Sequence, residues 1–436
     1  MRWFLLGIVA FFASGSAVAA PDLDGQWIVT TDRSGNPEYS TLNLQVVGAL
    51  VSGDSDGDRV TGTFRKGALD YAVTGASGSV YRFAARLDGD RLRGRADYPD
   101  HNFPNRRLSY AFTARRVPDR PSGAPRIVDY APTSFSNSFS AERAPVLTIW
   151  PGDTVRTTTI DSGGIDAAGV TRALFGNPQT GPFFVAGAQP GDTLAIHIVR
   201  LTLDRDWAES LDTIVNRAVG PSLAAGAGKL GRTIRWRLDR AGGYATPDRP
   251  SDALKDYRVP LRPMLGGVGL ASGFASPPLS TGDTGRAGGN MDFPEVIAGN
   301  IVYLPVQQPG ALLYLGDAHA LQGDGETSQY ALETSMAVEF RVELIKKRSI
   351  PMPRVESPTE IIVLGQAGSL DEALKAASTG LVQWLQQDYG LSLSDAAQVL
   401  GSGVRFSVPN LAGRSVGVAA RIDKALLQHI PREPKE

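Results

Sequence analysis

The chain has 436 residues, a length typical of two or three domains, and 42% of them are hydrophobic, enough for a buried core. Its 44 basic and 45 acidic residues leave a net charge of −1. That balance argues against nucleic acid or an anionic membrane surface as the main partner. Because there is no cysteine, a cysteine nucleophile, a zinc–thiolate site and disulfides are excluded. Any metal must be bound by His, Asp, Glu, carbonyl oxygen or water.

Residues 1–19 have the pattern of a signal peptide. Arg2 supplies a positive charge, residues 3–13 are apolar but too short to span a bilayer, and Ala17-Val18-Ala19 fits a cleavage site. We expect cleavage after Ala19 and export of the mature protein to the periplasm or the medium. No cysteine follows the site, so a lipid anchor is not expected.

Residues 20–118 are predicted to form a small antiparallel β domain. Tyr81, Phe83, Ala85 and Leu87 alternate with more polar residues, and Asp88-Gly89 then marks a hairpin turn. The pattern resembles a small lipocalin-like barrel. Residues 119–125 are rich in proline and predict an extended linker.

Residues 126–436 are expected to form a second domain, with a β core first and helices at its C-terminal end. Pro151-Gly152 and Pro190-Gly191 are both followed by Asp-Thr and a strand-like run, a weak hint of internal duplication. The fold class predicted for the whole chain is therefore mainly β with C-terminal helices.

Three helices are predicted near the C-terminus. Ser369 and Glu372 form a capping box before a helix that Gly390 ends, and its apolar face should include Leu370, Leu374 and Trp384. A shorter helix is expected over residues 392–400 and a third over residues 423–430. These helices should cover one face of the β core.

The stretch Gly316–Glu326 holds one of only four histidines in the chain. Asp317 and His319 are two residues apart, so on an extended chain their side chains point to the same side. Gly323 and Gly325 let a loop fold back and bring Asp324 and Glu326 towards the same point. Clustered carboxylates repel one another unless a cation or a shared proton neutralises them. A divalent metal site is one explanation, and a solvated acidic turn is the other.

Two further glycine-led turns present polar side chains beside predicted strands. Gly289 precedes Asn290 and Asp292, and Asp161 precedes Gly163-Gly164. Each alone is an ordinary turn more often than not, but together with the His319 stretch they fit the rim of one site.

Several of these motifs resemble the acetamidase/formamidase family over residues 126–430. The similar segments are Gly-Gly-Asn-Met-Asp at 288–292, Leu-Pro-Val at 304–306, Pro-Gly-Ala at 309–311, Gly-Asp-Ala-His-Ala-Leu-Gln-Gly-Asp-Gly-Glu at 316–326, and Asn-Pro-Gln-Thr-Gly-Pro at 177–182. The resemblance implies hydrolysis of short linear amides to a carboxylic acid and ammonia. It also implies a duplicated β core, a divalent metal and a possible homo-oligomer. One departure is Leu270–Phe274, where the family's usual proline is missing.

Matching the family motifs assigns the site residues. Asp317, His319, Asp292 and Asp161 are the expected metal ligands. Glu326 is the expected proton shuttle, with Asp324 beside it, and Asn290 is placed to donate to the developing oxyanion. For Glu326 the alternative is a partner that orients His319, and for Asn290 an ordinary turn residue. Zinc is the first expectation for the metal because of the histidine, with calcium as the alternative.

Two other functions stay open from the sequence. The same metal site could serve a larger amide or another acyl substrate. The chain could also be a non-catalytic binding protein of the cell envelope, since residues 20–118 lie outside the resemblance. A small amide is the expected partner, with no nucleic acid and no membrane anchor after cleavage.

Overall fold

The computed structural model describes residues 23–103 and 105–432, so the predicted signal peptide lies outside the described residues. The chain divides into two compact units. The first contains the described residues up to Thr31 and Leu42–Arg116, and the second contains Asp32–Thr41 and the chain from Val117 onward. No helix of the described part combines the length and the apolar character needed to cross a membrane.

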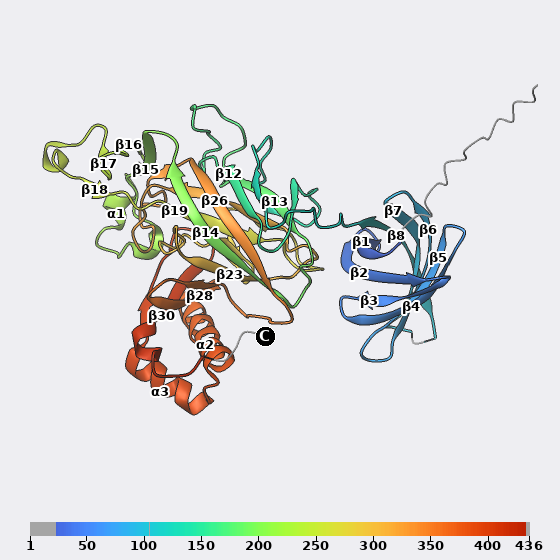
Figure 1. Cartoon of the computed structure of the whole chain (residues 1–436). Coiled ribbons are helices and arrows are strands. Elements are labelled where there is room, and N and C mark those ends of the chain that lie inside the picture. Colours follow the sequence, from blue (N-terminus) through green and yellow to red (C-terminus); the bar gives the residue numbers. More distant parts are fainter. Residues whose placement is uncertain (1–22, 104, 433–436) are drawn as a thin grey trace, which may run out of the picture. The chain divides into compact units, whose positions relative to one another are not determined.

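Eight antiparallel strands close into the N-terminal barrel (Figure 1). They are β1 (Gly25–Asp32), β2 (Pro37–Val47), β3 (Leu50–Ser55), β4 (Asp58–Arg65), β5 (Ala68–Thr74), β6 (Val80–Asp88), β7 (Arg91–Pro99) and β8 (Arg107–Arg116). Inward residues alternate with more exposed ones along most of the strands, and Trp27, Leu69 and Leu92 are fully buried inside. The predicted small β barrel is confirmed, whereas its lipocalin likeness stays a prediction.

Two large sheets form the body of the second unit. The first sheet contains β11 (Leu147–Ile149), β13 (Gln179–Val185), β15 (Trp207–Leu211), β16 (Thr233–Asp239), β17 (Tyr244–Pro247), β18 (Val259–Pro260), β19 (Met264–Leu270), β21 (Thr284–Gly285), β22 (Gly288–Asn290), β24 (Leu313–His319) and β25 (Glu333–Thr334). The second contains β9 (Ile127–Asp129), β12 (Thr154–Thr158), β14 (Thr193–Leu203), β23 (Ile301–Pro305), β26 (Met336–Ile345), β27 (Arg354–Glu356), β28 (Glu360–Ala367), β29 (Arg405–Ser407) and β30 (Val416–Asp423). A separate pair joins β10 (Ser138–Phe139) to β20 (Leu279–Ser280).

The main core of the second unit draws on both large sheets. Fully buried Leu265, Val268 and Leu315 come from the first sheet, and Ile196 and Phe340 come from the second. Strands β19 and β24 are buried along their whole length. Apart from Asp317 and His319, their apolar composition is what a strand covered on both faces requires.

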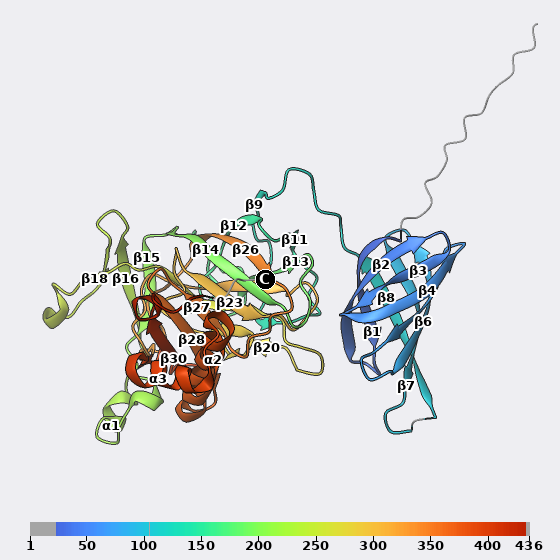
Figure 2. The same cartoon turned by 60° about the horizontal axis from the view of Figure 1, so that its bottom comes forward.

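The helices confirm two predicted starts. α2 (Leu370–Tyr389) begins after Ser369, whose hydroxyl accepts the Glu372 N–H at 3.3 Å, and it ends at Gly390 in the left-handed conformation. α3 (Leu393–Gly403) begins after Ser392, which forms a full capping box with Asp395. Figures 1 and 2 show α2 against β28 and β30 of the second sheet, and buried Trp384 and Leu385 pack there.

Two details differ from the sequence-based expectation. Residues 423–430 form only a short 3-10 helix, η3 (Lys424–Leu427), because β30 continues to Asp423 and shortens the segment before Pro431. Leu370 and Leu374 are 42% and 40% exposed, so the buried face of α2 starts at Ala373 instead. The extended chain expected at Asp317 and His319 is present, since β24 continues to His319.

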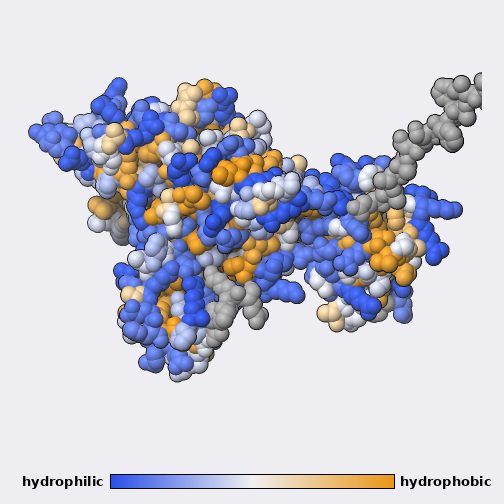
Figure 3. All heavy atoms as spheres, in the orientation of Figure 1, coloured by the Kyte–Doolittle hydropathy of each residue, from blue (hydrophilic) through white to orange (hydrophobic). Residues whose placement is uncertain are grey.

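The remaining helical segments are short: η1 (Asn216–Ala218), α1 (Ala224–Ala227) and η2 (Asp252–Leu254). Hydrophobic residues form separate patches among hydrophilic ones on the visible face of the second unit (Figure 3).

The strands and helices together confirm the predicted fold class, which is mainly β with C-terminal helices.

Candidate metal centre

Strands β19 and β24 place the central residues of the site opposite one another. Their antiparallel register pairs Leu265 with Ala318 and Gly267 with Gly316, so Gly266 lies opposite Asp317. His319 lies two residues further along β24, where it pairs with Met264, and its side chain points to the same face as that of Asp317. The alternation expected from the sequence is therefore what brings these two side chains together.

Three buried ligand atoms converge at this point. His319 Nε2 lies 3.7 Å from Asp292 Oδ1 and 3.7 Å from Asp317 Oδ2. All three side chains are at most 1% exposed, and none of these three atoms has a hydrogen-bond partner in the described part of the chain. Buried polar atoms are nearly always satisfied, so a set of unsatisfied atoms aimed at one point calls for a ligand.

Gly266 provides the space between these atoms. A Cβ atom at this position would lie 2.5 Å from Asp292 Oδ1, 2.6 Å from Asp317 Oδ2 and 2.8 Å from His319 Nε2. Any side chain would therefore occupy the place where the three ligand atoms meet. The residues present fit a bound cation, both in their donor set and in the room that the glycine leaves.

Hydrogen bonds orient two of the three side chains. His319 Nδ1 lies 2.8 Å from the Ala331 carbonyl oxygen, which can only accept, so Nδ1 carries a proton. Nε2 is then the atom that faces the two aspartates. Asp292 Oδ2 accepts from Asn290 Nδ2 at 2.8 Å and from Asn410 Nδ2 at 2.6 Å, which leaves Oδ1 for the centre. Such partners fix the direction of metal-binding side chains.

Two glutamates extend the cluster on the other side of His319. Glu333 on β25 pairs with His319 across the strands, and its Oε1 lies 3.9 Å from Nδ1. One ligand atom each from His319, Glu326 and Glu333 fall within 4.8 Å of one another. The sequence analysis missed Glu333, because its two-residue strand lies outside every recognisable motif. The only sequence signal was a lone glutamate in the apolar stretch around Leu332.

The electrostatics of the group reflect its crowding. Burial raises the pKa of Glu326 and of Glu333 well above the usual range, and neighbouring carboxylates add to this. Burial also raises the pKa of Asp292, to about 6, against the opposing effect of His319. For His319, burial lowers the pKa, but Glu333 and the two aspartates outweigh it and raise the pKa well above its ordinary value. Four carboxylates around one imidazole need either protons or a cation to balance their charge.

The backbone at this site is strained. Asp292, Asp317 and Glu326 have φ angles of 43°, 54° and 41°, in the left-handed region that residues other than glycine rarely adopt. Such conformations persist only where surrounding contacts enforce them, and they cluster at functional sites. Here three residues of one charged cluster adopt such a conformation.

Two of the residues expected at the site are not brought into this group. Both oxygens of Asp161 are occupied, because Oδ1 accepts from Ile165 N and Oδ2 from Arg205 Nη2, each at 2.8 Å. Arg205, which the sequence analysis also missed, is buried and stacks on Trp207 at 3.4 Å. Asp324 is exposed on the loop before Glu326. Asn290 lies at the group, with its amide nitrogen on Asp292 and its oxygen accepting from Asn177 at 2.8 Å.

The comparisons with known proteins agree with this geometry. A model described as the Acetamidase/Formamidase family matches residues 274–367, which include Asn290, Asp292, Asp317, His319 and both glutamates. A protein of Schizosaccharomyces pombe, which its name assigns to the formamidases, is 42% identical over 60 residues. That match covers 14% of this chain and only 15% of the length of the curated relative.

Solved structures extend the similarity to most of the second unit. An acetamidase from Bacillus halodurans is 27% identical, with a TM-score of 0.58, and the match covers 69% of this chain and 99% of the other. An acetamidase from Yersinia enterocolitica is also 27% identical, with a TM-score of 0.59 over 70% and 94% of the two chains. A predicted acetamidase/formamidase from Thermoanaerobacter tengcongensis shares the fold at 24% identity, with a TM-score of 0.59 over 70% and 98%. Residues 274–367 thus match the acetamidase/formamidase family, and the chain is similar over most of its length to solved acetamidases.

Proposed function

We propose that the second unit is a metal-dependent hydrolase that cleaves the C–N bond of short linear amides, of the formamide and acetamide type. The products are a carboxylic acid and ammonia. One observation carries the proposal: the unsatisfied atoms of Asp292, Asp317 and His319 meet at the space left by Gly266. Similarity to the family supplies the class of substrate.

Asp292, Asp317 and His319 would hold the metal. The imidazole favours zinc, and the surrounding carboxylate oxygens make calcium the alternative. The chemistry that a bound divalent cation supplies is polarisation of the amide carbonyl and acidification of a coordinated water. Amides need this help, because resonance weakens their carbonyl as an electrophile.

Glu326 is the proposed proton carrier. Burial raises its pKa well above the usual range, so the side chain accepts a proton more readily than an exposed glutamate does. In the proposed reaction it takes a proton from the attacking water and passes one to the leaving nitrogen, which then departs as ammonia. Asn290 and Asn410 keep Asp292 in place during this exchange.

The direct test is ammonia release from formamide, acetamide and propionamide, measured before and after chelation together with the metal content. Metal-dependent release would support the proposal. Glu326→Gln should keep the metal and lose at least about a hundredfold in kcat, the usual scale for a proton carrier, while the exposed Glu372→Gln on α2 should behave as the native protein.

The outcomes also separate the alternatives. Ammonia release only from larger amides would change the proposed substrate but not the proposed reaction. A different substrate would fit the missing family proline at Leu270–Phe274. No release from any amide, with stoichiometric metal still bound, would favour a binding protein of the envelope.

We also propose that the protein is exported and is periplasmic or secreted. The support is the sequence pattern of residues 1–19 alone. The mature chain should begin at Ala20. Mass spectrometry of the native protein checks this, and a mass equal to that of the uncut chain would refute it.

A further inference from the structure

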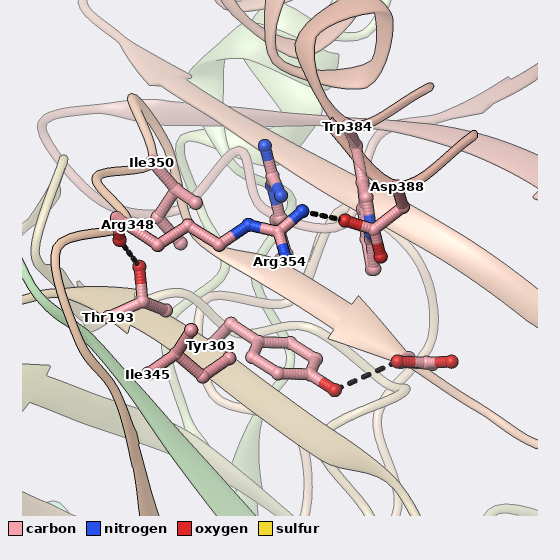
Figure 4. Close-up of a pocket in the computed structure, with 9 residues that line it drawn as sticks. Thr193, Tyr303, Ile345, Arg348, Ile350, Arg354, Trp384 and Asp388 are labelled. Atoms are coloured by element: carbon pink, nitrogen blue, oxygen red, sulfur yellow. Dashed lines mark hydrogen bonds and ion pairs between the residues drawn. The ribbon is translucent and has the colours of Figure 1, made fainter. Parts of the chain in front are cut away.

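A small cavity lies between α2 and the second sheet, away from the candidate metal centre (Figure 4). Its volume is about 20 Å³, which is enough for at least one water-sized occupant. Apolar walls come from Ile345, Ile350 and Trp384. The polar lining is formed by Thr193, Tyr303, Arg348, Arg354, Glu356 and Asp388.

The carboxylates of this cavity are already neutralised by other groups. Glu356 accepts from Tyr303 Oη at 2.8 Å and forms ion pairs with Lys424 at 2.9 Å and Arg432 at 3.1 Å. Asp388 accepts from Trp384 Nε1 at 3.0 Å. It also forms ion pairs with Arg432, at 2.9 Å, and with Arg348, which Figure 4 shows reaching it across the cavity.

Arg354 is the cation of this cavity that forms no ion pair within the described chain, although the charge of Asp388 acts on it at longer range. Its side chain comes from β27 and the residue is 3% exposed. One terminal nitrogen donates to Gln387 Oε1 at 2.8 Å, and the guanidinium lies 4.9 Å from the Trp384 ring centre. Its Nε has no hydrogen-bond partner, and no carboxylate of the described chain forms an ion pair with it.

The charges of the whole cluster also indicate that a negative charge is missing. Within residues 23–103 and 105–432, its cations are Arg348, Arg354, Lys424 and Arg432, whereas its carboxylates are Glu356 and Asp388. A buried charge without a partner is unfavourable, because neither water nor an opposite charge stabilises it. A cavity beside such a group is where a counter-ion would restore the balance.

We propose that this cavity binds a small monovalent anion, of halide or formate size, next to the Arg354 guanidinium. The narrow space excludes large anions, and one negative charge is what the unpaired guanidinium lacks. Burial lowers the pKa of Arg354 to about 9, so the side chain is still a cation at neutral pH. The anion would strengthen the contact between α2 and β27, since Arg354 and Gln387 belong to these two elements.

The test compares thermal unfolding of the full-length protein in sodium chloride, sodium formate and sodium gluconate at equal ionic strength. Gluconate is too large for the cavity and reports the general effect of salt. We expect chloride to raise the Tm of the second unit by about 2 °C or more over gluconate, with saturation as its concentration increases. A rise with both chloride and formate would define a general small-anion site, and a rise with chloride alone would define a halide site.

Two variants separate this site from other arginine clusters. Arg354→Gln should remove the difference between chloride and gluconate. Arg421→Gln breaks the partly buried ion pairs with Glu295 and Glu360 but should keep that difference. Equal differences in native protein and Arg354→Gln would overturn the proposal.

A second measurement does not depend on a variant that folds. Crystals of the native protein soaked in sodium bromide should show an anomalous peak within hydrogen-bond distance of Arg354 Nε. A water molecule there, with no bromide peak and no difference between chloride and gluconate, would show that the cavity holds solvent only. That result would refute the anion site and leave the amidase proposal untouched.

Discussion

Gly266 shows how a missing side chain can decide whether a site exists. We expect Gly266→Ala to lower metal affinity by roughly a hundredfold, because its Cβ would fall 2.5–2.8 Å from all three ligand atoms. Its φ is not in the left-handed region, so alanine brings no backbone strain there. Calorimetric titration with zinc measures the loss. Gly285→Ala, where nothing lies within 4 Å of the new atom, is the matched control.

Metal affinity should also depend on pH. Burial raises the pKa of Asp292 to about 6, so below that pH a proton occupies the carboxylate and competes with the cation. Affinity should therefore rise as pH increases through about 6. The stability of the metal-free protein should change in the opposite direction. A raised carboxyl pKa stabilises the folded state at low pH, and this stabilisation is lost as pH rises from about 4 to above 6. Zinc titrations between pH 5 and 8 and unfolding with chelator between pH 4 and 8 test the two expectations; a pH-independent affinity would contradict the assignment.

The sequence allowed part of the site to be predicted residue by residue. Asp317 and His319 could be predicted from the alternation of side chains along a strand. Asp292 and Glu326 could be predicted from the glycine-led turns that contain them. Glu333 was not, because its role depends on the pairing of β25 with β24. Asp161 fits the same motif logic as Asp292, yet Arg205 takes up its charge, and no local pattern reveals that long-range ion pair.

At the scale of elements, the loop after β29 serves as a support for the site. Asn410 is fully buried, donates to Asp292 Oδ2, and accepts from Ala412 N and Gly413 N. The same loop is tied to the Glu326 loop, since Gly325 N donates to Pro409 O at 2.8 Å and Leu411 N to Gly325 O at 3.0 Å. A C-terminal segment thus holds two loops of the centre in place.

We therefore expect Asn410→Ala to weaken metal binding by about 10- to 100-fold while the protein stays folded. The change frees Asp292 Oδ2 from one of its two side-chain donors, so the carboxylate can turn away. Asn300→Ala is the control, because Asn300 is also buried and donates to the Glu295 carbonyl outside the group. If both variants bound zinc as the native protein does, the supporting role of Asn410 would be refuted.

Local signals explain which elements were predictable. Capping residues defined the starts of α2 and α3, because a serine side chain satisfies the first free N–H groups of a helix wherever it occurs. The segment at 423–430 has helical composition but follows β30, whose pairing with β28 extends to Asp423. Pairing between strands far apart in sequence overrode the local preference there.

At the scale of the whole molecule, metal should contribute to the stability of the second unit. Binding to the native state alone adds about 4 kcal/mol at a free concentration a thousand times the Kd. We expect chelation to lower the unfolding temperature of the second unit. The transition of the barrel, which has a core of its own, should stay unchanged. Calorimetry with zinc and with chelator measures both, and equal shifts in the two transitions would contradict a metal site confined to the second unit.

The left-handed conformations of Asp292, Asp317 and Glu326 have a consequence for how such a chain evolves. Each costs of the order of 1–3 kcal/mol in an ordinary residue, and glycine would remove that cost. Selection for heat resistance alone would therefore favour glycine at these three positions and discard the ligands and the proton carrier first. Retention of the acidic residues there depends on selection for the chemistry, and lineages freed from that selection should lose these residues before they lose the fold.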